Sequence, residues 1–275
     1  MAQLSGERIH FYCQILFWLE AQLNEKRKER LLEQKASRPL FVGLNAPQGA
    51  GKTTLTKWLV DQLEEKQIQA LAISIDDFYL TCEQQVQLAQ ANSDNPYLQQ
   101  RGYPGTHDIE LGVKTLQQLR KNQSEVAIPR YVKSAHQGKG DRSPENFWPV
   151  VTAPFDLVLI EGWCLGFSPL ANAEGVSAPM RKINELLNEY SLWHEFLDAK
   201  IVLSPKHPEY VIDWRIEAER NMRASGQGGM SDEDIRAYVQ TFLPAYELYA
   251  QALRENPLGF ARFMWMEIGR GRLPG

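Results

Sequence analysis

The chain has 275 residues, of which 43% are hydrophobic and 23% charged, and its formal net charge is −4. This composition is typical of a globular protein with one substantial core, and the acidic balance argues against nucleic acid as the main partner. No apolar run reaches the ~20 residues of a membrane span, the first residues do not resemble a signal peptide, and the three cysteines have no disulfide or metal-binding spacing. We therefore expect a cytoplasmic protein without a membrane partner; its oligomeric state stays open.

Helices and strands alternate along the predicted secondary structure. In chain order we expect a helix over residues 9–35, a strand over 40–44, a helix over 53–66, a strand over 70–75, and helices over 81–92 and 109–121. A strand over 126–129 and a polar stretch over 130–149 precede a strand over 155–160, a helix over 179–196 and a strand over 200–203. Helices over 209–224 and 231–254 and a strand over 260–266 follow. This order predicts a three-layer α/β fold with a mostly parallel sheet, an N-terminal helical extension (1–37) and one domain (38–275).

The first predicted strand runs into a glycine-rich loop that is followed at once by a helix. This strand–loop–helix arrangement is typical of a phosphate-binding loop, in which small residues let the backbone approach phosphate oxygens and the helix start attracts the anion. The residues expected to bind the nucleotide are Ala46, Pro47, Gln48, Gly49, Ala50, Gly51, Lys52, Thr53 and Thr54. Ala46 stands where the usual pattern has glycine. A glycine-rich turn that binds nothing would not account for Lys52 and Thr53, so we expect an ATP or GTP user.

Two further strands deliver carboxylates to the edge of the sheet where α/β proteins bind ligands. Glu161 follows the apolar strand 155–160 and is expected to hold Mg²⁺ with Thr53, directly or through water. Asp76 and Asp77 end the second strand, and neighbouring residues of an extended segment point to opposite sides. We expect Asp76 to accept a proton from an acceptor hydroxyl while its neighbour ties down the next loop. The alternative for each acid is a structural cap.

Cationic and aromatic residues are concentrated between the expected strands 70–75 and 155–160. Because arginine binds carboxylates in a bidentate manner, this concentration favours an anionic acceptor. The residues expected to bind the acceptor are Asp76, Asp77, Tyr79, Arg101, His107, Arg130, Tyr131, Lys133 and Arg142.

A lid is predicted over about residues 212–232, where three arginines precede a glycine-rich break at 225–229. Glycines allow a hinge, and arginines can close over phosphates. We assign Arg220 to the transferring phosphoryl group, together with Lys52, and Arg215 and Arg223 to the nucleotide. Spacing alone does not select among the three.

The order of these motifs resembles the phosphoribulokinase, uridine kinase and pantothenate kinase group of P-loop kinases. Residues 74–81, 101–108, 129–142 and 161–167 are more narrowly similar to D-glycerate 3-kinases of the photorespiratory type. The resemblance implies a nucleoside-kinase-like fold, ATP and Mg²⁺ as cofactors, Asp76 as the base, adenine contacts near residues 269–272, and phosphorylation of D-glycerate to 3-phospho-D-glycerate.

Three other functions remain open from the sequence. A kinase of this group could act on pantothenate, a nucleoside or another sugar acid. A nucleotide-dependent switch or ATPase would have no small acceptor, and the paired Asp76 and Asp77 speak against it. A nucleic-acid translocase is disfavoured by the acidic charge. Redox regulation through Cys82 or Cys164 is also left open.

Overall fold

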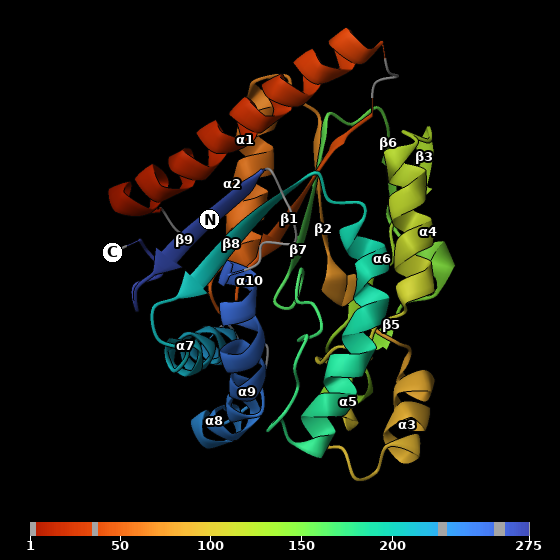
Figure 1. The fold of residues 1–275 in the computed structure, drawn as a ribbon, viewed down its shortest axis with the longest axis vertical. Coiled ribbons are helices and arrows are strands. Elements are labelled where there is room, and N and C mark those ends of the chain that lie inside the picture. Colours follow the sequence, from red (N-terminus) through yellow and green to blue (C-terminus); the bar gives the residue numbers. More distant parts are fainter. Residues whose placement is uncertain (1–3, 35–37, 225–229, 256–261, 275) are drawn as a thin grey trace.

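A five-stranded parallel sheet forms the centre of the protein, which is described here by a computed structural model covering residues 4–34, 38–224, 230–255 and 262–274. The strand order is β2 (Ala70–Ser74), β7 (Leu157–Gly162), β1 (Leu40–Asn45), β8 (Ala199–Pro205) and β9 (Phe263–Ile268). All residues of β1 and β7 are buried, as expected of inner strands covered on both faces. Their carboxyl ends point toward the lower part of the molecule in Figure 1.

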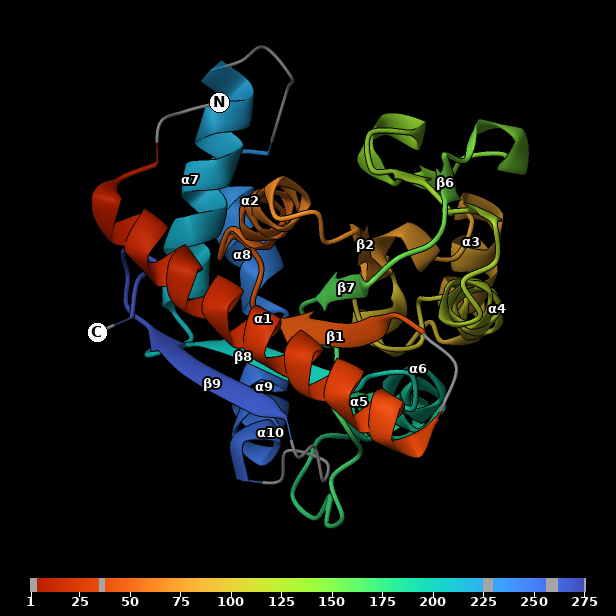
Figure 2. The ribbon, with the colours of Figure 1, turned by 90° about the horizontal axis from the view of Figure 1, so that it is seen from above.

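Helices cover both faces of this sheet, which gives three layers. The helices are α1 (Gly6–Glu33), α2 (Lys52–Glu65), α3 (Cys82–Ala91), α4 (Ile109–Arg120), α5 (Ala178–Leu186), α6 (Ser191–His194), α7 (Tyr210–Ala224), α8 (Asp232–Gln240), α9 (Leu243–Ala245) and α10 (Gln251–Glu255). Figure 2 shows α2 and α7 on one side of the sheet and α4, α5 and α6 on the other. The predicted three-layer α/β class is therefore confirmed.

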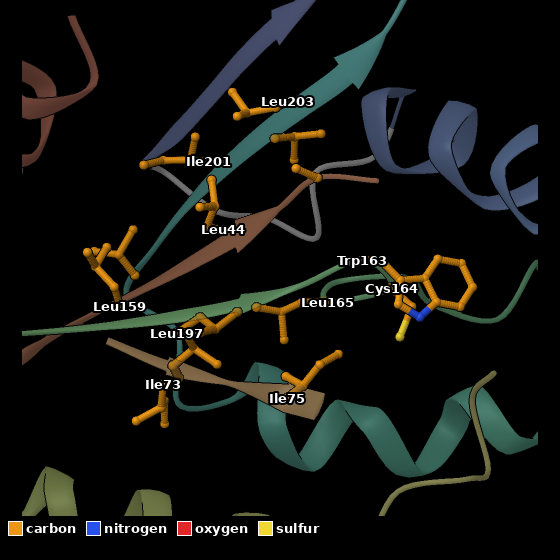
Figure 3. Close-up of a cluster of buried hydrophobic side chains, with 14 of the residues drawn as sticks. Leu44, Ile73, Ile75, Leu159, Trp163, Cys164, Leu165, Leu197, Ile201 and Leu203 are labelled. Carbon is orange, nitrogen blue, oxygen red and sulfur yellow. The ribbon is translucent and has the colours of Figure 1, made fainter. Parts of the chain in front are cut away.

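The core fills the space between the sheet and these helices. Figure 3 shows part of it: leucine and isoleucine side chains from β1, β2, β7 and β8 pack together, and Trp163 and Cys164 follow the end of β7. Helix α1 belongs to the same core, because its apolar face is buried there. Its Tyr12 ring lies 5.5 Å from the Trp58 ring of α2. None of the described helices is long and apolar enough to cross a membrane.

Two expected helices are interrupted. The helix expected over residues 231–254 ends at Gln240 and resumes as α9, in which Pro244 occupies the first turn. Proline lacks a backbone N–H and clashes with the preceding turn, so Pro244 cannot donate the hydrogen bond to Gln240 that would continue the helix. The helix expected over 179–196 is divided into α5 and α6 by a 3₁₀ turn, Leu187–Tyr190. The glycine-rich break expected at 225–229 lies outside the described residues.

The polar stretch 130–149, for which no element was expected, contains short strands. Within it, strand β4 (Tyr131–Val132) pairs antiparallel with β5 (Asp141–Arg142). On either side of it, β3 (Glu125–Ala127) pairs antiparallel with β6 (Val150–Thr152). The pairing of β4 with β5 makes a small hairpin, residues 131–142, called the acceptor hairpin below. It gives a fixed backbone to a segment that carries several predicted acceptor residues.

Candidate active site

The loop between β1 and α2 leaves the first turn of α2 open. Gly51 precedes the helix with φ of 90°, and no side chain caps the helix start. The unpaired N–H groups of that turn and the positive end of the helix dipole therefore attract an anion. Lys52 donates hydrogen bonds to the carbonyl oxygens of Ala46, at 2.9 Å, and Pro47, at 3.1 Å. Burial lowers the pKa of Lys52, and the nearby carboxylates of Glu161 and Asp76 oppose that effect.

A cavity of about 350 Å³ lies beside this loop and collects most of the predicted catalytic and nucleotide residues. The predicted residues that line it are Gln48, Gly49, Gly51, Lys52, Thr53, Thr54, Asp76, Tyr79, Arg101, Lys133, Glu161 and Arg215. They come from widely separated parts of the chain, and the carboxyl ends of β1, β2 and β7 bring their loops together. The cavity therefore joins a phosphate-binding loop to two carboxylates and three further cations.

Asp76 and Asp77 have different partners, as expected, but the reason is a turn rather than strand alternation. Strand β2 ends at Ser74, and Ile75–Phe78 form a 3₁₀ turn in which the Ser74 hydroxyl accepts a hydrogen bond from the Asp76 N–H. Asp76 lines the cavity and pairs with Lys133, with Oδ2 and Nζ 2.6 Å apart. Burial would raise the pKa of Asp76, but Lys133 and Lys52 lower it to about 2.

Asp77 is not among the lining residues of the cavity. Its Oδ1 accepts a hydrogen bond from the backbone N–H of Tyr131 at 3.0 Å, and its Oδ2 lies 3.4 Å from Arg130. Burial raises the pKa of Asp77, and the N–H of Tyr131 opposes that shift. This carboxylate therefore fastens the acceptor hairpin to the end of β2, which is a positioning role rather than contact with an acceptor.

Glu161 lies at the end of β7, opposite Leu44 of β1 and Ser74 of β2. Its side chain lines the cavity, and the residue is 8% exposed. Burial raises the pKa of Glu161, while the ammonium group of Lys52 lowers it. Among the described residues, no three His, Cys, Asp or Glu side chains are grouped so as to hold a metal. The Glu161 carboxylate and the Thr53 hydroxyl suit a Mg²⁺ ion that takes its other ligands from phosphate and water.

Of the predicted acceptor cations, the structure brings Arg101 and Lys133 to the cavity and leaves Arg130 and Arg142 outside it. The guanidinium of Arg130 pairs with Asp77. That of Arg142 lies 3.0 Å from Asp108 and is 13% exposed. Both arginines are held by carboxylates outside the cavity, so they position the acceptor hairpin.

Two predicted aromatic residues, His107 and Tyr131, support Tyr79 instead of lining the cavity. The His107 ring stacks on Tyr79 with centroids 4.3 Å apart, and the Tyr131 ring meets Tyr79 edge-on at 5.3 Å. His107 Nδ1 lies 2.6 Å from the Tyr190 hydroxyl, and burial lowers the pKa of His107 to about 4. This histidine is therefore neutral near pH 7 and holds the Tyr79 ring in place.

The three lid arginines are placed differently from one another. Arg215 lines the cavity, and its guanidinium lies 2.6 Å from Glu219 one turn later. Its buried Nε has no hydrogen-bond partner. Arg220 and Arg223 instead pair with Asp232 of α8, at 3.0 Å from Arg220 Nε and 2.7 Å from Arg223 Nη2. These two arginines tie α7 to α8, and the structure does not bring them to the cavity.

Three lining residues were missed from the sequence: Trp163, Ala218 and Tyr238. Trp163 lies two residues beyond Glu161, so its nearness to a strand-end carboxylate was an available signal. Its indole N–H donates to the Gly102 carbonyl at 2.9 Å, and this bond fixes the orientation of the ring. Tyr238 comes from α8, and no local pattern marks a helix residue this far along the chain as part of the site.

The C-terminal segment lies against the phosphate loop. Arg272 donates from Nε to the Gly49 carbonyl at 2.7 Å and from Nη2 to the Trp214 carbonyl at 3.3 Å. The Trp214 indole N–H donates to the Arg270 carbonyl at 2.6 Å. Residues 269–272, expected to contact adenine, are thus bound to α7 and the loop, and their contact with adenine stays a prediction.

Comparison with known proteins agrees with this geometry. Residues 41–168 match the profile of the phosphoribulokinase / uridine kinase family. A Saccharomyces cerevisiae protein named "Probable ATP-dependent kinase TDA10" is 34% identical over 251 residues, which cover 85% of this chain and 86% of that protein. The chain belongs to the phosphoribulokinase / uridine kinase family. Membership of this family of P-loop kinases implies the use of ATP.

Two relatives within this family carry a more specific name. The chloroplastic D-glycerate 3-kinase of Arabidopsis thaliana is 39% identical over 257 residues, which cover 91% of this chain. The match spans 56% of the length of that plant protein. The solved structure of D-glycerate 3-kinase from Cryptococcus neoformans is 30% identical, with a TM-score of 0.84, and the match covers 96% of this chain and 97% of that one.

Proposed function

We propose that this family member transfers the γ-phosphoryl group of ATP to the 3-hydroxyl of D-glycerate, giving 3-phospho-D-glycerate and ADP. The observation that carries the proposal is the single cavity in which Lys52 and the open start of α2 face Asp76, Arg101 and Lys133. A phosphate site, a carboxylate and two cations are the groups that phosphorylation of a small hydroxy acid requires. The names of the Arabidopsis and Cryptococcus relatives support this acceptor.

Each group has a role in the proposed reaction. Lys52, the N–H groups of the first turn of α2 and Arg215 bind the phosphates and stabilise charge on the transferring group. The acceptor oxygen forms a bond to the γ-phosphorus while the bond to the bridging oxygen of ADP breaks. The hydroxyl proton passes to the Asp76 carboxylate. Thr53 and Glu161 would hold Mg²⁺, which supplies positive charge beside the phosphate oxygens.

A nucleoside is the second candidate acceptor, because Tyr79, Trp163 and Tyr238 give the cavity aromatic surface. Nucleosides stack on such rings, but they would leave the two cations without an anionic partner. The cations therefore favour a carboxylate, which pantothenate and other sugar acids also carry. An ATPase or switch protein would hydrolyse ATP without any of these acceptors.

The test is ADP release by the purified protein with Mg-ATP, measured alone and with D-glycerate, L-glycerate, pantothenate or uridine. Strong stimulation by D-glycerate is the expected result. Stimulation by another acceptor alone would replace the substrate and keep the kinase, whereas slow hydrolysis unaffected by all four would favour the ATPase. We also propose a cytoplasmic location and a role in photorespiration, which fractionation and metabolite measurements in a deletion strain would check.

A further inference from the structure

Lys133 forms an ion pair with Asp76, the carboxylate that the proposed function needs as a base. It lies directly after β4 in the acceptor hairpin, and its Nζ is 2.6 Å from Asp76 Oδ2. Both residues line the cavity. In this arrangement Asp76 already accepts a charged hydrogen bond, and the ammonium group makes the carboxylate a weaker proton acceptor.

The backbone on both sides of this ion pair is held in place. Asp76 is part of the turn that the Ser74 hydroxyl caps. The acceptor hairpin is fixed to the same region, because Asp77 accepts from Tyr131 N–H and Asp141 accepts from Cys82 N–H at 2.9 Å. The ammonium group can therefore change partner by rotation of the lysine side chain alone, without movement of the hairpin.

The lysine side chain is free to make that change. It is 61% exposed, whereas the Asp76 side chain is 28% exposed. The ammonium group of this exposed lysine can be rehydrated when it leaves Asp76. Lysine is also a single-point donor on a flexible stem, unlike the rigid fork of arginine. A second carboxylate that enters the cavity can therefore compete for Lys133.

We propose that Lys133 binds the carboxylate of the acceptor. When its ammonium group leaves Asp76 for that carboxylate, Asp76 becomes able to act as the base. This inference rests on the proposed function, since it takes D-glycerate as the acceptor. Without an acceptor, Lys133 covers Asp76 and water in the cavity is poorly activated. With an acceptor bound, the Lys133 ammonium group pairs with the substrate carboxylate, and Asp76 can accept the hydroxyl proton. Phosphoryl transfer is thereby coupled to the presence of an anionic acceptor.

The coupling implies a second activity with an incomplete acceptor. D-Lactate has the carboxylate and 2-hydroxyl of D-glycerate but no 3-hydroxyl, so it would draw Lys133 away and leave room for water at the reacting position. The water oxygen then bonds to the γ-phosphorus, the bond to the bridging oxygen of ADP breaks, and the water proton passes to Asp76. The products are ADP, inorganic phosphate and a proton, and D-lactate is unchanged.

The experiment measures ADP release by the full chain with Mg-ATP alone, with D-lactate and with D-glycerate, for the parent, Lys133→Met and Lys139→Met. Lys139 is in the same hairpin but does not line this cavity, so it is the matched control. ATP affinity is measured alongside to show that each variant is folded. In the parent, we expect D-lactate to raise hydrolysis several-fold. In Lys133→Met, acceptor-free hydrolysis rises several-fold, D-lactate has no further effect, and KM for D-glycerate increases by ~10- to 100-fold, because one charged contact is lost.

The proposal requires both the stimulation by D-lactate in the parent and the raised acceptor-free hydrolysis in Lys133→Met, and the absence of either overturns it. A merely structural role for Lys133 would lower every rate together and is thereby distinguished. If Lys133→Met does not fold, the parent with D-lactate still decides the matter. Failure of D-glycerate to stimulate the parent would refute the proposed acceptor instead, and the acceptor-free rate of Lys133→Met would still report on the ion pair.

Discussion

Gly49 of the phosphate loop and Trp214 of α7 are in direct contact. A Cβ atom on Gly49 would lie 2.8 Å from the Cβ of Trp214 and 2.9 Å from its carbonyl carbon. Gly49 also has φ of +75°, which side chains disfavour. The glycine therefore permits the close packing that brings Arg215, the residue after Trp214, to the cavity.

Gly49→Ala should lower both stability and ATP binding, because the new methyl group forces α7 away from the loop. We expect a loss of unfolding free energy beyond the ~1–2 kcal/mol of left-handed backbone strain alone, together with a raised KM for ATP. Urea denaturation and ADP-release assays measure the two effects. Gly138→Ala is the control: its φ is +90° but nothing lies within 4 Å of the added atom. Equal losses in the two variants would argue against the contact.

Arg215 and Arg220 lie in different parts of the structure, and we expect their substitution to affect kcat differently. Arg215 lines the cavity, whereas Arg220 pairs with Asp232 on the surface. Arg215→Met should lower kcat by ~10²- to 10³-fold, the range for loss of one group that stabilises transition-state charge. Arg220→Met should leave kcat within about twofold, since exposed ion pairs contribute little. Steady-state kinetics with ATP and D-glycerate measure both kcat values. A larger loss of kcat in Arg220→Met than in Arg215→Met would support the assignment of Arg220 made from the sequence.

The contrast between these arginines shows what could be predicted from the sequence. The phosphate loop is local: strand, glycines, Lys52 and Thr53 are contiguous, so their arrangement follows from the backbone they share. The carboxyl ends of β2 and β7 were predictable for a similar reason, because parallel strands present these ends at one edge. Asp76 and Glu161 therefore line the cavity at the edge of the sheet where ligand binding was expected.

Side chains held by partners distant in sequence were not predictable in this way. Arg142 was expected in the acceptor site, but Asp108 holds it outside the cavity. Tyr238 lines the site from α8, far along the chain from the phosphate loop and the strand-end carboxylates. The local periodicity of the sequence indicates neither the Arg142–Asp108 pair nor the position of Tyr238 in the site.

Tyr238→Phe should weaken acceptor binding and leave ATP binding unchanged. Tyr238 lines the cavity from α8, and burial raises the pKa of its hydroxyl, which stays a proton donor at neutral pH. Loss of one neutral hydrogen bond predicts a KM for D-glycerate that is about two- to tenfold higher. Tyr97→Phe, outside the cavity, is the control in the same kinetic assay. An unchanged KM in Tyr238→Phe would remove this hydroxyl from the acceptor site.

Stability should fall in mild acid because of the buried His194. Its Nε2 accepts a hydrogen bond from Gly166 N–H at 2.8 Å, and burial, with a contribution from Lys200, lowers its pKa to about 3. In the unfolded chain the pKa returns to about 6.5, so the unfolded state takes up a proton below that pH while the folded state does not. The stability that His194 provides is therefore complete above pH 6.5 and decreases toward pH 3.

The expected loss from His194 between pH 7.5 and pH 5 is about 2 kcal/mol of unfolding free energy. Urea denaturation at both pH values measures it. His194→Gln should make the pH dependence shallower by that amount, whereas His10→Gln, at an exposed position of α1, should leave it as in the parent. Parallel pH profiles for the parent and His194→Gln would contradict the buried neutral histidine.

The most direct test of the proposed reaction is the product formed from ATP and D-glycerate by the parent and by Asp76→Asn, read by ³¹P NMR. Asparagine keeps the shape of the side chain but cannot accept the proton. We expect 3-phospho-D-glycerate from the parent, and from the variant a rate lower by at least ~10²-fold with ATP binding retained. Formation of 3-phospho-D-glycerate by Asp76→Asn at close to the parent rate would contradict the assignment of the base.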